Sequence, residues 1–211
     1  MATTRSAYGA SDIAMADPLY LSVWFPSFSP IEMMPRAASV LKLFPYSNTR
    51  PGIEYVSVQP LSWNEASVLE RRFRPGLDSD QAIALAGDLL YDDYAYSFEV
   101  NWDLWLRSEE TEKWTIQPSP ARIIANGIKF DDGTYQQHGH IQFDFGLDSP
   151  FLYEDIELDE MDEARVRSNV QKLVAFTNVL EKNCGLTGRV LWSESEENLA
   201  QKLIARLQKV Q

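Results

Sequence analysis

The strongest strand signal in the chain is the stretch Tyr94-Ala-Tyr-Ser-Phe-Glu-Val-Asn-Trp-Asp-Leu-Trp-Leu106. Apolar and polar side chains alternate along it, and a period of two residues is typical of a β-strand. One face carries Phe98, Val100, Trp102, Leu104 and Leu106, and the other carries Ser97, Glu99, Asn101, Asp103 and Trp105. The stretch predicts an antiparallel sheet with one apolar and one polar face, because a strand buried on both sides would be apolar throughout.

Other segments of the chain carry weaker signals of the same kinds. Runs of β-branched and aromatic residues predict strands at residues 19–25, 53–58, 68–74, 114–116, 122–130, 138–145 and 190–192. Helices are predicted after the capping residues Ser29, Asp78 and Ser193 and at residues 163–183, where an apolar stripe has helical spacing. Pro118 and Pro120 cannot both belong to a central ladder, so we expect a bulge or a sheet edge there.

The order of these elements indicates the fold class. It is β-α-β-β-α-β followed by β-β-α-β-α, and its first half matches the ferredoxin-like, split β-α-β order. We therefore expect an α+β fold with an antiparallel sheet, helices on one face, and a second half that extends the sheet. Residues 19–211 would form a single domain, with sub-halves 19–110 and 111–211 as an alternative, and residues 1–18 a flexible N-terminal arm.

The composition excludes several classes of protein. The 211 residues include 31 acidic and 19 basic side chains, and a net charge of −12 disfavours binding to nucleic acid. No apolar run approaches the roughly 18 residues of a membrane span, and residues 1–18 lack the apolar centre of a secretory signal. Cys184 is the only cysteine, so an intrachain disulfide cannot form. We expect a soluble, cytoplasmic protein that binds neither nucleic acid nor membranes.

Charge is concentrated in two short segments. Residues 148–163 carry eight acidic side chains and no basic one. The simplest interpretation is helix initiation, because carboxylates are stabilised at a helix N-terminus, and a docking surface for a basic partner or a calcium loop is the alternative. The cluster Arg71-Arg72-Phe73-Arg74 could hold an anionic ligand, but pairing with the many acidic groups is the simpler explanation.

One hypothesis about chemistry rests on the two histidines of the chain. His138 and His140 would face the same way as Asp144 on the strand predicted at 138–145. Imidazole and carboxylate groups suit zinc and non-haem iron, so a metal-assisted enzyme built on His138, His140 and a carboxylate is one alternative. The common nucleotide-binding, zinc-protease and nucleophile motifs are absent, and we expect no cofactor.

A binding function is the favoured interpretation. Trp105 lies on an otherwise polar strand face, where an indole must pack under another segment or contact a ligand. The candidate ligand-binding residues are those of the predicted polar faces: Glu99, Asn101, Asp103, Trp105, His138, His140 and Asp144. The partner would be a small molecule or another protein. A homo-oligomer that hides this face is the remaining alternative.

Overall fold

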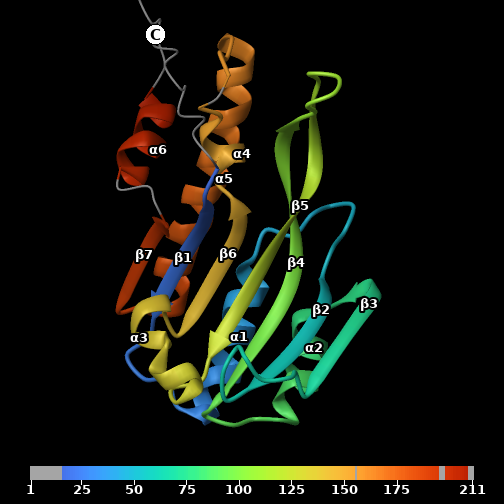
Figure 1. Ribbon diagram of the computed structural model, residues 1–211, viewed down its shortest axis with the longest axis vertical. Helices are drawn as coiled ribbons and strands as arrows, with labels where there is room; N and C mark the ends of the chain where they lie inside the picture. The colour runs from blue at the N-terminus through green and yellow to red at the C-terminus, as the bar shows by residue number, and fades with distance from the viewer. Residues whose placement is uncertain (1–15, 155, 195–197, 209–211) are drawn as a thin grey trace, which may run out of the picture.

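The computed structural model describes residues 16–154, 156–194 and 198–208 (Figure 1). Its strands are β1 (Pro18–Trp24), β2 (Ile53–Pro60), β3 (Leu69–Leu77), β4 (Tyr94–Arg107), β5 (Trp114–Asn126), β6 (Ile141–Leu147) and β7 (Gly188–Ser193). Its α-helices are α1 (Pro30–Leu43), α2 (Ser79–Gly87), α3 (Tyr135–His138), α4 (Ser149–Leu152), α5 (Glu160–Cys184) and α6 (Leu199–Gln208). Of the arm predicted at 1–18, residues 1–15 lie outside the described residues, and Pro18 already belongs to β1.

The described strands form one antiparallel sheet in the order β3-β2-β4-β5-β6-β1-β7. α2 connects β3 to β4, which run parallel with β2 between them, and α5 lies between β6 and β7, which run parallel on either side of β1. The fold is therefore α+β with an antiparallel sheet, as predicted. The ferredoxin-like order is not confirmed, because β1 pairs with β6 and β7 rather than with a strand of the first half.

The helices α1, α2 and α5 lie behind the sheet in the view of Figure 1. The predicted apolar face of β4 points to this side: Phe98, Val100 and Trp102 are completely buried, and Leu104 nearly so. Val170, Leu173 and Leu180 of α5 join the same core. None of the described helices combines the length and the apolarity that crossing a membrane requires.

The strand β5 is continuous through both of its prolines. Pro118 and Pro120 lie opposite Asp103 and Asn101 of β4, without a shift in register. On its other side β5 pairs with β6 only over residues 122–125, so both prolines lie at a sheet edge. Proline lacks the backbone N–H, but at an edge no neighbouring strand needs that donor, so the cost in free energy is small. Of the two predicted outcomes, the structure therefore shows the edge and not the bulge.

The region between β5 and β6 differs from the prediction. The strand predicted at 122–130 ends at Asn126, and the strand predicted at 138–145 begins only at Ile141. His138 ends α3, and Gly139 turns the chain with a φ of 89°. A Cβ atom at position 139 would lie 2.8 Å from the backbone nitrogen of Val23. The alternation around His138 and His140 was therefore misread as part of a strand, because this close approach of two backbones is invisible in the sequence.

The acidic segment does begin a helix. α5 starts at Glu160, and the side chain of Asp159 accepts a hydrogen bond of 2.7 Å from the backbone N–H of Asp162. Glu160, Asp162 and Glu163 occupy the first turn. Helix initiation is therefore the role of this part of the segment, as expected from the helix dipole.

Candidate functional site

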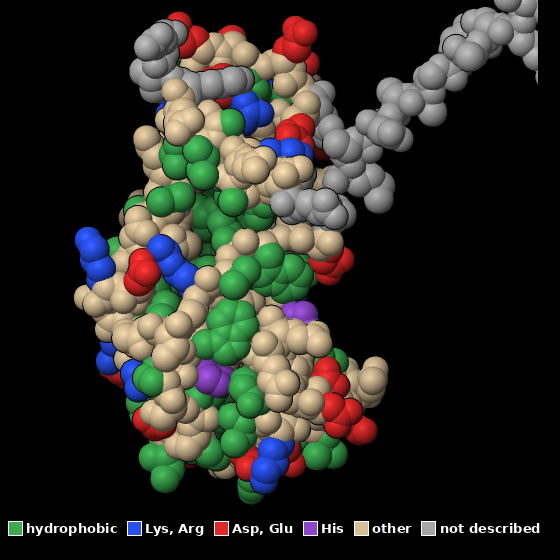
Figure 2. Space-filling model, turned by 90° about the vertical axis from the view of Figure 1, so that its left-hand side faces the viewer, with side chains coloured by type: hydrophobic (Ala, Val, Ile, Leu, Met, Phe, Trp, Pro, Cys, Tyr) green, Lys and Arg blue, Asp and Glu red, His purple; other side chains and the backbone are tan. Residues whose placement is uncertain are grey.

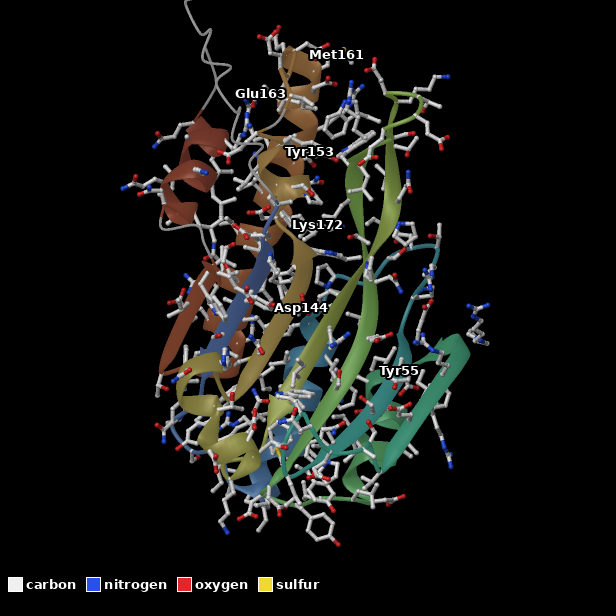
Figure 3. The ribbon with its side chains drawn as sticks, viewed as in Figure 1. Tyr55, Asp144, Tyr153, Met161, Glu163 and Lys172 are labelled. Atoms are coloured by element: carbon white, nitrogen blue, oxygen red, sulfur yellow. The ribbon has the colours of Figure 1, made fainter. Side chains whose placement is uncertain are left out.

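The face of the sheet opposite α1, α2 and α5, called the open face below, carries a row of side chains with one residue from every strand. Strand pairing sets these residues directly opposite one another in the order Arg72, Tyr55, Glu99, Arg122, Asp144, Tyr20 and Trp192. Directly opposed side chains have Cβ atoms about 4.5–5.5 Å apart and therefore interact. Figure 3 labels two members of this row, Tyr55 on β2 and Asp144 on β6.

The two ends of the row differ in chemistry. Near the β3 edge, the carboxylate of Glu99 lies 3.6 Å from the guanidinium of Arg72 and 3.8 Å from that of Arg122. The guanidinium of Arg72 also lies 4.7 Å from the ring centre of Tyr55. Near the β7 edge, the rings of Tyr20 and Trp192 are 4.6 Å apart. The row thus passes from a charged network to an aromatic pair.

A cover closes the lower part of the open face in Figure 1; it consists of the loop 61–67 and the segment 127–138. Trp63 of the loop packs edge-on against Phe130 of the segment, with ring centres 5.0 Å apart. Phe130 forms a second small apolar cluster with Ala95 and Ile124 of the sheet. Because this cover ends before the row, the row itself stays accessible.

The cover is held in an unusual backbone conformation. Leu61, Asp131 and Asp132 have φ values of 59°, 47° and 54°, in the left-handed region that few residues other than glycine adopt. The backbone N–H of Asp131 donates a hydrogen bond of 2.8 Å to the carbonyl oxygen of Leu61. Such conformations cost free energy and cluster at binding sites, where surrounding contacts enforce them.

A groove of about 310 Å³ lies between this cover and the row. From the sheet it is lined by Tyr20, Arg122, Ile124, Asn126, Gln142, Asp144 and Trp192, from the cover by Trp63, Asp131, Thr134 and His138, and after β7 by Glu194. A second hollow of about 250 Å³ adjoins it and shares Arg122 and Asp144. Figure 2, which faces the β7 side, shows a histidine beside a hollow at the margin of the molecule.

The groove carries more negative than positive charge. Of the charged residues that the structure describes there, Asp131, Asp144 and Glu194 line the groove together with a single cation, Arg122. Within the described part of the chain, none of these three carboxylates forms a salt bridge. Burial raises the pKa of Tyr20, and the negative charges of Asp144 and Glu194 raise it further. The positive charge of Arg122 acts in the opposite direction and lowers this pKa.

The two histidines occupy different environments. His138 forms part of the groove wall, with its ring 5.6 Å from that of Trp192, and its buried Nδ1 has no partner among the described residues. His140 is 9% exposed and its ring stacks on Phe28 and Tyr135. Its Nδ1 accepts a hydrogen bond of 3.0 Å from the backbone N–H of Phe25, and burial lowers its pKa to about 4. His140 is therefore a neutral residue of the interior.

The structure does not bring a metal site together from these residues. In residues 16–154, 156–194 and 198–208, no group of three or more His, Cys, Asp or Glu side chains is arranged to hold a metal ion. Cys184, at the end of α5, is buried, and burial raises its pKa.

Besides His140, three of the predicted site residues lie away from the groove: Asn101, Asp103 and Trp105. Asn101 is buried, and Asp103 accepts hydrogen bonds from the backbone N–H and the side-chain amide of Asn48. Burial acts to raise the pKa of Asp103, but these hydrogen bonds and the charge of Lys172 outweigh it and lower that pKa. Asp103 thus anchors a loop.

Trp105 lies where β4 has no neighbouring strand on one side. The side chain of Asn169 in α5 takes the place of that strand, since it bonds both the N–H and the carbonyl oxygen of Trp105, at 2.9 and 2.8 Å. The guanidinium of Arg165 lies 5.6 Å from the Trp105 ring centre. The indole is therefore packed by α5 and lies outside the groove.

Of the predicted site residues, His138 and Asp144 line the groove and Glu99 lines the neighbouring hollow. The sequence did not point to the other ten residues that line the groove, among them four with large side chains. Tyr20, Trp63, Arg122 and Trp192 come from four separate segments. The alternation in residues 19–25 could have assigned Tyr20 to the polar face, but only strand pairing places it beside Asp144 and Trp192.

Comparisons with known proteins give no indication of function, so the proposal below rests on the groove. The chain matches no protein-family model, no curated protein and no solved structure.

Proposed function

We propose that the protein is a binding protein and that the groove on its open sheet face holds a small polar molecule. The observation that carries this proposal is the composition of the groove: three aromatic side chains, Tyr20, Trp63 and Trp192, line it together with charged and amide groups. Ligand sites are typically concave, about 300–1,000 Å³ in volume, and lined by aromatic side chains with a few polar groups that orient the ligand. A groove of about 310 Å³ is at the small end of this range.

The walls of the groove are held in place by hydrogen bonds. The indole N–H of Trp192 donates to the hydroxyl oxygen of Ser22, which is fully buried, over 3.0 Å. The indole N–H of Trp24 donates to the carbonyl oxygen of Tyr135 in the cover, over 2.9 Å. Walls fixed before binding lose little conformational entropy when a ligand arrives, which favours affinity.

The test is a screen of small polar molecules by ligand-observed NMR, repeated on a variant with a filled groove. Gln142→Trp places a large side chain on the groove floor, and Gln117→Trp makes the same change on an exposed part of β5 outside the groove. We expect ligands that bind the unmodified protein to be lost with Gln142→Trp and retained with Gln117→Trp. Ligands that bind all three proteins equally would contradict the proposal.

No observation favours the two other hypotheses, a metal-assisted enzyme and a homo-oligomer. The metal-assisted enzyme needs His138, His140 and a carboxylate at one ion, whereas His140 packs between rings in the interior. The homo-oligomer stays a prediction, which light scattering at several protein concentrations tests.

A further inference from the structure

We propose that the groove selects a cation, in particular a ligand with an alkylammonium group. This inference rests on the proposed binding function and adds the charge and chemical class of the ligand. It is carried by the meeting of unpaired carboxylates and aromatic rings at one end of the row.

The first step concerns the charges. Among the described residues that line the groove, Arg122 is the one cation, and its guanidinium lies 3.8 Å from Glu99, toward the β3 edge. Asp144 and Glu194, on the β7 side, form no salt bridge with any described residue. A bound anion would be repelled by these two carboxylates. A neutral ligand would displace water from them, which costs free energy, without supplying an opposite charge. A bound cation compensates the charge of both carboxylates.

The second step concerns the aromatic groups. Tyr20 lies directly opposite Asp144 on one neighbouring strand and opposite Trp192 on the other. The ring of Trp192 has two aromatic neighbours, with ring centres 4.6 Å away for Tyr20 and 5.6 Å away for His138. Aromatic faces attract cations through their quadrupole, and aromatic cages with acidic groups recognise quaternary ammonium compounds. Carboxylate and ring are therefore neighbours in the groove, as an alkylammonium group requires.

The third step concerns a polar atom of the groove wall that lacks a hydrogen-bond partner. The buried Nδ1 of His138 has no partner in the part of the chain that the structure describes, and His138 lines the same groove. A buried polar atom without a partner costs free energy, so it favours a ligand that brings a hydrogen-bonding group. An ammonium compound with a hydroxyl or amine substituent fits both the charges and this atom.

The experiment uses two probes of equal shape. Choline carries a trimethylammonium group, and 3,3-dimethyl-1-butanol replaces the charged nitrogen of choline with carbon. We expect the protein to bind choline about ten-fold more tightly than the butanol in calorimetry, a difference of about 1.4 kcal/mol, because only choline gains a cation–π contact and a charge pair. Raising the salt from about 0.01 M to about 0.15 M shortens the screening length from about 30 to about 8 Å and should weaken choline binding only.

Variants assign the effect to the groove. Asp144→Asn removes the charge but keeps an oxygen for the N–H of Gly146, which now donates to Asp144 over 2.9 Å. We expect it to weaken choline binding about five-fold or more and to leave binding of the butanol unchanged. Asp80→Asn is the matched control, because Asp80 belongs to α2 and pairs with Lys42. Glu194→Gln is a second groove variant that does not depend on the folding of Asp144→Asn.

The outcomes separate the two proposals. If choline binds no more tightly than the butanol, or does not bind, cation selection is wrong. If both probes then bind equally and Gln142→Trp abolishes the binding of both, the proposed binding function is supported and selection for a cation is not. If choline binds selectively but Asp80→Asn weakens it as much as Asp144→Asn, the attraction comes from the overall charge of −12 and the assignment to the groove is wrong.

Discussion

The two faces of the sheet are built from alternate residues of the same strands but have opposite properties. On the helix-covered face, Trp102 is fully buried and its ring lies 5.0 Å from that of Phe145. On the open face, the side chains of the row from Arg72 to Trp192 remain partly accessible, and several line hollows. The helix-covered face therefore supplies most of the free energy of folding. The open face can carry charged groups, which would cost too much free energy in a core.

The largest expected effect compares two tryptophans across the sheet. Trp102→Ala should lower the free energy of unfolding by about 3–5 kcal/mol, because it opens a cavity in the core. Trp192→Ala should lower it by about 1–2 kcal/mol, since its side chain is only half-buried and loses one hydrogen bond, to Ser22. Denaturant unfolding of both variants measures the difference. Equal losses would mean that the open face belongs to the core.

The second prediction compares His140 with His138. Burial lowers the pKa of His140 to about 4, whereas an unfolded histidine has a pKa of about 6.5. Between these values the unfolded chain binds a proton that the folded protein excludes, so stability is complete above pH 6.5 and falls as the pH drops toward 4. We expect a loss of about 2 kcal/mol from this residue between about pH 7 and pH 5.

The matched variants are His140→Phe and His138→Gln, followed by denaturant unfolding at both pH values. His140→Phe should flatten the pH dependence, although it leaves the N–H of Phe25 without its acceptor and is less stable throughout. His138→Gln should keep the pH dependence of the unmodified protein. If His138→Gln removes the pH dependence instead, the assignment of His140 as the buried neutral histidine is wrong.

The smallest expected effect concerns the charged end of the row. Glu99→Gln removes a carboxylate that pairs with Arg72 and Arg122, whose side chains are 73% and 47% exposed. Because exposed ion pairs are screened by water, we expect a change of at most about 1 kcal/mol in the free energy of unfolding, and less at high salt. Thermal and denaturant unfolding at two salt concentrations test this. A loss comparable to that of Trp102→Ala would show that the charged row is essential for folding.

The sequence predicted most of the elements because each rests on local patterns. The two faces of β4 follow from its alternation, and the apolar stripe at residues 163–183 predicted most of α5, which spans Glu160–Cys184. The prediction failed around His138-Gly-His140, where the turn depends on the backbone of Val23, more than a hundred residues earlier in the chain. For the site, polarity on a predicted face selected Glu99 and Asp144, which line the groove or the hollow beside it, and also Trp105, which packs against α5.

By itself, the sequence determined the type of each element and which side chains share a face, because side-chain direction alternates from residue to residue whatever the strand's partner. Only the tertiary structure decided that β1 lies between β6 and β7, and so that Tyr20 meets Asp144 and Trp192 in one groove. Strand order depends on contacts between distant segments, such as the hydrogen bond from Trp192 to Ser22, and no local pattern encodes which distant strand will be the neighbour.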